Sequence, residues 1–528
     1  MSADAITTEQ TSRPEPASQE TINEVLKEVD DLVVSAMNEH TIPGVGVGII
    51  RAEKPIYLRG FGLAKVEDGR PVTPTTIFRI GSISKILTAV GLMQLWEQGN
   101  FGLDDPVNDY LKSYQIGRPD PAAPPVTFRH MLTHTSGIGE LRTYMDLLRP
   151  VVGLGVKRDK GVPPLEEYYA RGLKPEVYPG TKWAYCDHNF ATLGQVIKEI
   201  SGIPFPQYMI RNVFEPLGMN HTDYLRSERV REELAQGYKF KRSRLEPVKY
   251  LEIAVTGAGS VFSDLEDMSR YVAALLGGGR NENGAILKEE TLGLMMQPHY
   301  PLDGRFPAMG LAFILDDLEG HPIVWHNGGW PGFHCGMFLA PESELGVLVF
   351  GNALSRAPDL IAKDILRRIL DLPDPASQLP RKGILETPRL WPKLSGFYGP
   401  RRGLNTNARI WFAFAGEVEV YVKKNRLALR TLAGPLRKGI ALYPVDPDDP
   451  LTFKSVHEDD VLSIAFGRSP EGESMHHVRI GLNTLYKRPK LRSLRFRTAA
   501  GLGVTAGTAL ALTGRSKLKR AQETANSP

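Results

Sequence analysis

Hydrophobic residues first recur at helical spacing and then alternate with polar ones. Between residues 21 and 38 the apolar positions fall on one side of a helix: Ile22, Val25, Leu26, Val29, Leu32, Val33 and Met37. Two alternating runs follow at 44–50 and 56–62, which is typical of β-strands joined by a turn. A second periodic run begins after Gly81 and ends near Gly99. The pattern predicts a helix, a β-hairpin and a second helix with Ser82 at its N-terminus.

The middle of the chain differs in composition and in hydrophobic periodicity. Residues 108–279 are rich in Pro and Gly and contain amphipathic stretches at 190–201 and 265–276, which predict a mostly helical insertion. Strand patterns return at 308–315, 321–326, 336–339 and 346–350, followed by a helix over 358–370. This order predicts an α+β fold, in which both chain ends build one antiparallel sheet flanked by helices, with a mostly helical subdomain.

The last third indicates further boundaries. Residues 373–392 contain five prolines without a clear period, which predicts a linker. Short alternating runs at 409–414, 417–422, 426–430, 462–466 and 477–480 predict a small β-barrel or sandwich over 393–490. The predicted organisation is therefore a disordered lead-in at 1–20, a main domain at 21–372, the linker, the β domain and a basic tail at 491–528.

Charge is unevenly distributed along the 528 residues. The net charge is +4, but residues 487–520 carry ten Lys or Arg and no acidic residue. The remainder is mildly acidic, so the basic balance is not a nucleic-acid signature and no nucleic-acid partner is expected. In the tail, seventeen uncharged residues, 498–514, lie between basic flanks. We expect a solvated, disordered tail, with peripheral membrane contact through 487–520 as the alternative.

Cysteine usage and the N-terminus bear on the compartment. Cys186 and Cys335 are the only cysteines, too few for a disulfide scaffold or a thiolate metal cluster. The first twenty residues have no apolar segment of the kind found in secretory signals. These features predict a cytoplasmic protein, with no metal and no cofactor.

Ser82 and Lys85 are the first candidate reactive pair. Three residues apart on a helix, they share one face and lie within side-chain reach. A lysine in a dry cleft can have its pKa lowered enough to act as a base toward serine. The same Ser-x-x-Lys spacing recurs at Ser516 and Lys519, so the pair alone also fits a capping serine and a solvated lysine. The neighbouring sequence decides between these interpretations.

Several ordered motifs surround the pair. Residues 77–85 read Ile-Phe-Arg-Ile-Gly-Ser-Ile-Ser-Lys, residues 128–137 contain Leu-Thr-His-Thr-Ser-Gly, 185–187 read Tyr-Cys-Asp and 326–329 read His-Asn-Gly-Gly. Together, over about residues 22–370, the chain resembles the serine β-lactamase and penicillin-binding-protein family, including class C β-lactamases, DD-peptidases and family VIII esterases. The resemblance implies an acyl-enzyme on Ser82, with Lys85 as the activating base and a mostly helical subdomain beside the sheet.

The resemblance also implies roles for other residues. The phenol of Tyr185 would share proton transfer with Lys85. The backbone N–H groups of Ser82 and Gly329 would form the oxyanion hole. Asp187, His326 and Gly328 would line the substrate site.

Two positions depart from the family pattern. Asp187 replaces an asparagine, and an ionised carboxylate would favour a charged Lys85, so either Asp187 points elsewhere or Tyr185 carries more of the base function. His326 replaces the lysine common in β-lactamases and DD-peptidases. Histidine is largely neutral at pH 7, which favours neutral esters or amides over substrates with a carboxylate.

Other enzyme classes lack their signatures here. The chain has no Gly-x-Ser-x-Gly, His-Glu-x-x-His, Cys-x-x-Cys or Walker-type motif. The predicted function is a serine hydrolase acting on small-molecule esters or amides. A DD-peptidase or D-aminopeptidase activity and a non-catalytic scaffold or ligand-binding protein are the alternatives, and the sequence does not define the oligomeric state.

Overall fold

A computed structural model describes residues 18–495 except 302–305, 375–376, 378, 380–386, 401–413, 458–459 and 470–471. The chain divides into two compact units, Met1–Asp374 and Pro375–Pro528. Most of the predicted lead-in and nearly all of the basic tail, including the uncharged stretch 498–514, lie outside the described residues. The predicted strand over 409–414 also falls almost wholly outside them.

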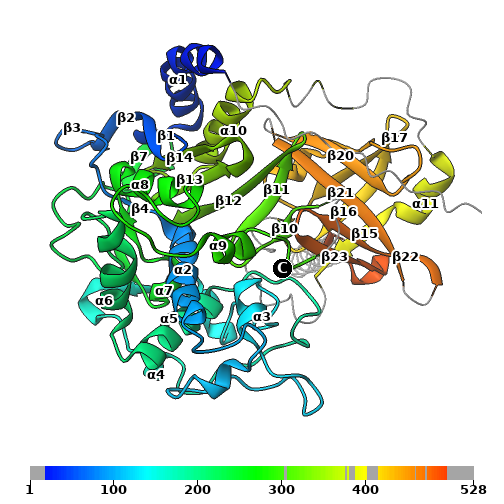
Figure 1. The fold of residues 1–528 in the computed structure, drawn as a ribbon. Coiled ribbons are helices and arrows are strands. Elements are labelled where there is room, and N and C mark those ends of the chain that lie inside the picture. Colours follow the sequence, from blue (N-terminus) through cyan, green and yellow to red (C-terminus); the bar gives the residue numbers. More distant parts are fainter. Residues whose placement is uncertain are drawn as a thin grey trace, which may run out of the picture. The chain divides into compact units, whose positions relative to one another are not determined.

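The first unit is built on an eight-stranded antiparallel sheet with the order β10-β11-β12-β13-β14-β1-β2-β3 (Figure 1). Its strands are β1 (Gly44–Arg51), β2 (Lys54–Lys65), β3 (Arg70–Pro71), β10 (Ala308–Met309), β11 (Ile314–Leu318), β12 (His321–Trp330), β13 (Phe333–Ala340) and β14 (Leu345–Gly351). Strand β1, near the start of this unit, pairs with β14, near its end. Val47, for example, lies opposite Val349. The predicted α+β fold, with a sheet made from both chain ends, is confirmed.

One predicted strand of this sheet is wrong. Residues 308–315 form two strands, β10 and β11, which pair antiparallel with Met309 opposite Ile314. Ala312 between them has a φ of 72°. A left-handed residue of this kind reverses the chain, and a continuous hydrophobic pattern does not reveal it.

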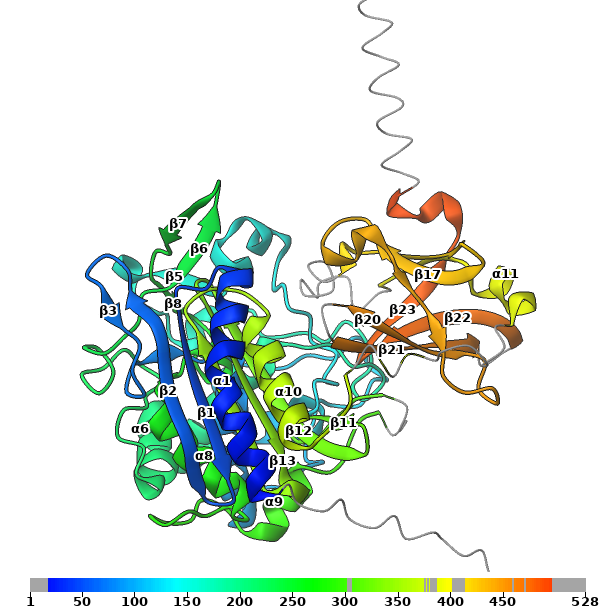
Figure 2. The ribbon, with the colours of Figure 1, turned by 90° about the horizontal axis from the view of Figure 1, so that it is seen from above.

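Two helices cover one face of the sheet, α1 (Gln19–His40) and α10 (Ala357–Ile369) (Figure 2). Alternate residues of β1, namely Val45, Val47 and Ile49, are buried in their hydrophobic cluster. The intervening Gly46 faces the other way, where an added Cβ would lie 3.0 Å from Leu265 Cδ1. Strand β1 is therefore buried on both faces, which explains its nearly continuous apolar sequence.

The opposite face carries α8 (Leu265–Leu276) and the larger hydrophobic cluster that includes α2 (Ser84–Glu97). Helix α2 is buried nearly all round, since Ser84 to Met93 are all buried. The other helices of this unit are α3 (Phe128–Leu132), α4 (Leu165–Tyr168), α5 (Asp187–Ser201), α6 (Phe205–Met209), α7 (Thr256–Gly259) and α9 (Glu289–Met295). This unit also contains three short antiparallel pairs of strands: β4 (Phe78–Arg79) with β9 (Phe262–Ser263), β5 (Gly155–Lys157) with β8 (Leu251–Ile253), and β6 (Tyr238–Lys241) with β7 (Arg244–Pro247).

The second unit is a nine-stranded antiparallel sheet with the order β18-β17-β16-β15-β23-β22-β21-β20-β19. Its elements are β15 (Gly396–Gly399), β16 (Val418–Lys423), β17 (Arg426–Thr431), β18 (Ile440–Ala441), β19 (Tyr443–Pro444), β20 (Thr452–His457), β21 (Asp460–Ser469), β22 (Gly472–Ile480), β23 (Asn483–Arg488) and the short helix α11 (Trp391–Leu394). Strand β18 at one end contacts β20 near the other, so the sheet is nearly closed. This confirms the predicted small β-barrel or sandwich.

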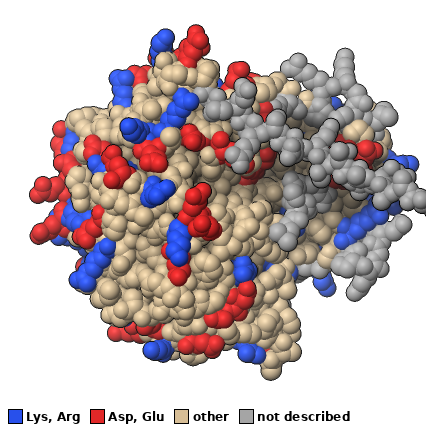
Figure 3. Space-filling view, in the orientation of Figure 1, with Lys and Arg blue, Asp and Glu red and all other residues tan. Residues whose placement is uncertain are grey.

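On the face of the first unit shown in Figure 3, Lys and Arg side chains are interspersed with Asp and Glu. Of the helices that the described residues form, none is both long and apolar enough to span a bilayer. Both cysteines are buried free thiols.

The two neighbouring valines of α1 test whether this helix is part of the core. Val33 is fully buried against the sheet, whereas Val34 is 48% exposed. We expect Val33→Ala to lower the free energy of unfolding by about 2 kcal/mol, because it removes buried methyl groups and leaves a cavity. Val34→Ala should change it by less than about 0.5 kcal/mol. Urea denaturation of both variants checks this, and equal losses would contradict the packing.

Candidate functional site

Ser82 lies in a tight turn immediately before helix α2. Residues Gly81–Ile83 form one turn of 3₁₀-helix, and α2 begins at Ser84. Gly81 has a φ of 54°, a conformation that favours glycine. The predicted position of Ser82 at the N-terminus of the α-helix is therefore corrected by one short turn. The serine is 7% exposed.

Lys85, one turn along, is the centre of the site. Its Nζ lies 3.1 Å from Ser82 Oγ, 2.5 Å from Asp187 Oδ1 and 2.6 Å from the carbonyl oxygen of Ala258. The side chains of Lys85 and Asp187 are 0% and 6% exposed. The possibility that Asp187 points away from Lys85 is thereby ruled out: Asp187 is the first residue of α5, and its carboxylate reaches the amine directly.

These three contacts define where the protons of the amine lie. A carboxylate and a carbonyl only accept hydrogen bonds, so two N–H groups of Lys85 point to Asp187 and Ala258. The remaining tetrahedral position faces Ser82 Oγ. In the neutral amine this position is the lone pair, which accepts the serine proton. In the ammonium it is an N–H. The geometry therefore suits proton transfer between Oγ and Nζ in both directions.

Tyr185 lies beside the same amine. The centroid of its ring is 4.8 Å from Lys85 Nζ, and the residue is 7% exposed. The imidazole of His134 stacks on this ring, with centroids 4.1 Å apart and an interplanar angle of 23°. His134 also accepts hydrogen bonds from both neighbours of the tyrosine, through Nδ1 from the Cys186 N–H (3.0 Å) and through its carbonyl from the Ala184 N–H (2.8 Å). The Thr-His-Thr-Ser-Gly motif thus fixes the segment that carries Tyr185.

Strand β12 supplies the wall that the His-Asn-Gly-Gly motif predicts. Alternation places His326 and Gly328 on the site face, while the Asn327 amide donates to Asp359 on α10 (2.7 Å). His326 is buried, its Nδ1–H donates to the Asn327 carbonyl (2.6 Å), and its ring centroid is 6.1 Å from that of Tyr185.

The backbone of β12 lies very close to the turn Gly81–Ile83, which carries Ser82 and is called the nucleophile turn below because Ser82 is the predicted nucleophile. A Cβ added to Gly328 would lie 1.8 Å from the Ile80 carbonyl oxygen and 2.8 Å from Ser82 N. A Cβ added to Gly81 would lie 2.8 Å from Gly329 N. The two nitrogens predicted to form the oxyanion hole, those of Ser82 and Gly329, are therefore on adjacent segments, and only glycine permits this approach.

One contact of the site was not found by sequence reasoning. The Ala258 carbonyl, which holds Lys85, comes from the short helix α7. Every residue has such a carbonyl, so no side-chain motif identifies it. The small residues around it were the available signal, since a Cβ on Gly257 would lie 2.5 Å from the Phe190 carbonyl oxygen. This close packing brings α7 to α5 and hence to Lys85.

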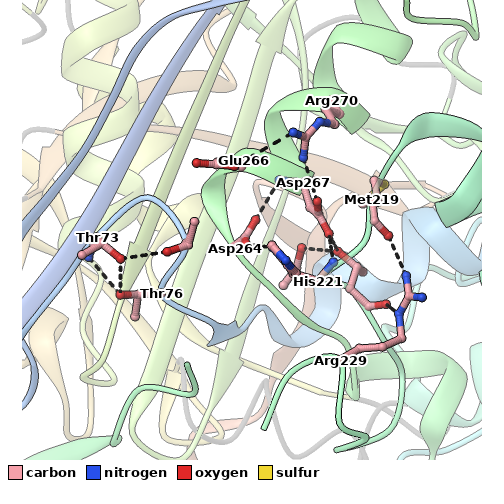
Figure 4. A network of polar contacts seen from close by, with 12 residues as sticks. Thr73, Thr76, Met219, His221, Arg229, Asp264, Glu266, Asp267 and Arg270 are labelled. Atoms are coloured by element: carbon pink, nitrogen blue, oxygen red, sulfur yellow. Dashed lines mark hydrogen bonds and ion pairs between the residues drawn. The ribbon is translucent and has the colours of Figure 1, made fainter. Parts of the chain in front are cut away.

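A separate polar cluster has the residue types of a metal site. His221, Asp264 and Asp267 have ligand atoms within 4.8 Å of one another (Figure 4). However, Asp264 accepts hydrogen bonds from Asp267 N–H (2.8 Å) and His221 Nδ1 (3.0 Å), and Asp267 from His221 N–H (2.6 Å) and Arg270 (3.0 Å). Burial raises the pKa of Asp264 to about 7. Because protein donors already occupy both carboxylates, we assign Asp264 to capping helix α8 and Asp267 to holding the segment at His221.

Comparisons with known proteins show which family this chain resembles in sequence and fold. A model of the Beta-lactamase family matches residues 29–372. The putative penicillin-binding protein PbpX of Bacillus subtilis (strain 168) is 27% identical over 317 residues, which are 58% of this chain and 70% of the relative.

Two solved structures share the fold. One is the octameric penicillin-binding protein homologue from Pyrococcus abyssi, with a TM-score of 0.59, 26% identity and coverage of 88% of this chain and all of that chain. The other is EstCE1, described as a hydrolase with promiscuous acyltransferase activity, with a TM-score of 0.57, 22% identity and coverage of 67% and 99%.

The close approach at Gly328 generates a stability prediction. We expect Gly328→Ala to lower the free energy of unfolding by at least about 1–3 kcal/mol, because its Cβ would overlap a backbone carbonyl that cannot rotate away. Gly293→Ala in α9 is the matched control, since a Cβ there meets nothing within 4 Å. Urea denaturation should show the loss only in the first variant. Equal stability of the two would mean that β12 does not lie against the nucleophile turn.

Proposed function

Because the chain belongs to the Beta-lactamase family, we propose that it is a serine hydrolase that forms an acyl-enzyme on Ser82 with small esters or amides. The observation that carries the proposal is the position of Lys85 Nζ, 3.1 Å from Ser82 Oγ and anchored by Asp187 and Ala258. A base held this firmly against a hydroxyl is what nucleophilic catalysis by serine requires.

In the proposed acylation step, Ser82 Oγ attacks the substrate carbonyl carbon while its proton moves to Lys85 Nζ. The negative charge that develops on the carbonyl oxygen is stabilised by the N–H groups of Ser82 and Gly329. When the tetrahedral intermediate collapses, the bond to the leaving group breaks and that group takes a proton from Lys85 or Tyr185. Water then attacks the acyl carbon while its proton passes to the same pair. The bond between that carbon and Ser82 Oγ breaks, Oγ takes a proton back from the pair, and the acid is released.

Asp187 has a defined part in this scheme. Its carboxylate stabilises the ammonium that forms as Ser82 loses its proton, and it keeps Nζ pointing at Oγ. The cost is that it also favours the charged form before reaction. Tyr185, whose ring centroid lies 4.8 Å from the amine, is the second group to which we assign proton transfer.

The wall formed by β12 bears on the substrate. His326 stands where a lysine would bind a substrate carboxylate, and its Nδ1–H is engaged by the Asn327 carbonyl. A neutral imidazole offers a hydrogen bond in place of a fixed cation. This supports uncharged esters or amides. The alternative, a DD-peptidase or D-aminopeptidase activity, is favoured by the likeness to PbpX.

A non-catalytic scaffold is the remaining candidate. A buried Lys–Asp pair costs desolvation free energy that an apolar pair would not. Its presence beside a serine hydroxyl therefore supports catalysis over a merely structural role.

Covalent labelling tests the nucleophile and the base. We expect a fluorophosphonate to add once to the folded protein, and Ser82→Ala to abolish the adduct. Lys85→Met should slow p-nitrophenyl acetate hydrolysis by at least about 10²-fold, because it removes the proton acceptor, whereas Lys112→Met, at an exposed lysine, should not. Intact-mass spectrometry and absorbance assays give the readouts. An adduct that persists in Ser82→Ala would refute the assignment of the nucleophile.

The role of Asp187 can be read from a pH profile. Asp187→Asn removes the negative charge of the carboxylate beside the ammonium of Lys85. The neutral, reactive amine should therefore persist to lower pH. We expect the acidic limb of kcat/KM for p-nitrophenyl acetate to move to lower pH relative to the wild type. A limb that stays in place would show that Lys85 is not the group whose deprotonation activates the enzyme.

A further inference from the structure

A cavity of about 380 Å³ in the first unit has a strongly basic lining that the proposed hydrolysis does not use. Six cationic side chains line it against two acidic ones: Lys65, Arg70, Arg79, Arg226, Arg231 and Lys249 against Asp68 and Glu232. Lys65 is paired with Asp68 at 2.6 Å and Arg70 with Glu233 at 3.8 Å, which leaves Arg79, Arg226, Arg231 and Lys249 against Glu232. The cavity therefore retains an excess of positive charge.

Arg79 forms the least ordinary part of this lining, because it is only 2% exposed. Its Nη1 donates to the Leu251 carbonyl (2.5 Å), but none of the described residues accepts a hydrogen bond from Nε or Nη2. The guanidinium lies instead among aromatic rings, 4.7 Å from the centroid of Trp330, 5.1 Å from Phe262 and 5.2 Å from Tyr250.

The charge of Arg79 is poorly compensated. Burial lowers the pKa of its guanidinium to about 10, still well above neutral pH, so the group stays charged. Glu252 is the acidic side chain that acts on it, but no carboxylate of the described chain lies within 4.0 Å of it. A buried charge that no carboxylate contacts directly costs folding free energy, and a bound anion would offset that cost.

Other lining groups offer direct contacts and an apolar surface. Arg231 and Lys249 are exposed at the cavity, and Arg226 reaches over the Tyr250 ring with its carbon Cζ 5.0 Å from the centroid. Trp330, Tyr250 and Phe333 add aromatic walls. The cavity therefore offers aromatic surface beside a cluster of cationic groups.

We propose that this cavity binds a small organic anion, a carboxylate with an apolar body, whose charge lies near Arg79 and is contacted by Arg226, Arg231 and Lys249. The aromatic walls hold the body of the ligand. Ser82, Lys85, Tyr185, Asp187 and His326 do not line the cavity, so the site is distinct from the hydrolytic centre. It nevertheless adjoins that centre along the chain, since Arg79 precedes the nucleophile turn and Trp330 follows Gly329.

Calorimetric titration of the full chain tests the proposal, with benzoate as the probe and benzamide as its uncharged counterpart. We expect benzoate to bind one site per chain, at least about tenfold more tightly than benzamide, because only the anion meets the guanidinium groups. Inorganic phosphate should bind more weakly than benzoate, since it lacks an apolar body. Ser82→Ala should bind benzoate like the wild type.

Variants of the lining locate the site. Arg79→Met and Arg231→Gln should each weaken benzoate binding several-fold, and Arg171→Gln, at an exposed arginine outside the cavity lining, should not. If Arg79→Met fails to fold by circular dichroism, Arg231→Gln and Arg226→Gln decide. The proposal is overturned if benzoate and benzamide bind alike, if phosphate binds as tightly as benzoate, if the lining variants bind like the wild type, or if binding is lost in Ser82→Ala. None of these outcomes depends on whether Ser82 is acylated.

Discussion

The structure around the site depends on one buried amine. Lys85 is fully enclosed, and its three tetrahedral positions are taken by Asp187, the Ala258 carbonyl and Ser82 Oγ. A buried ammonium or amine is tolerated only when its hydrogen bonds are satisfied, so α5 and α7 must both pack against α2. Gly257 allows the close approach of α7 to α5, and Gly81 and Gly328 allow that of β12 to the turn before α2.

Much of this arrangement could be predicted from the sequence, because the residues involved occur in motifs with side-chain chemistry. Ser82, Lys85, Tyr185 and His326 lie on separate elements that the structure brings together around the amine and the wall of β12. Their catalytic roles remain predictions. The orientation of Asp187 could not be predicted, since one residue on a helix start has several directions open to it. Nor could the split of β10 from β11, which depends on a left-handed Ala312.

The basic cavity could not be predicted from the sequence, for another reason. Its cations are spread from Lys65 to Lys249 and form no motif. Only the fold gathers them around Arg79, whose burial among aromatic rings gives no local signal. The candidate hydrolytic site differs from this cavity. The wall at His326 lacks the fixed cation that the family pattern would place there, whereas the cavity gathers six cationic side chains. The proposed anion site and the proposed acyl-transfer site are thus different places in the same unit.

The central claim is that Ser82 Oγ, the Lys85 amine and the two backbone nitrogens act on one carbonyl group. A crystal structure of the protein after reaction with a phosphonate tests this most directly, because the tetrahedral phosphorus imitates the intermediate of acyl transfer. The account predicts phosphorus bonded to Ser82 Oγ, one phosphonyl oxygen within hydrogen-bond distance of both the Ser82 and Gly329 nitrogens, and Lys85 still bound to Asp187. A phosphonyl oxygen directed away from both nitrogens, or a Lys85 displaced from Ser82, would contradict it.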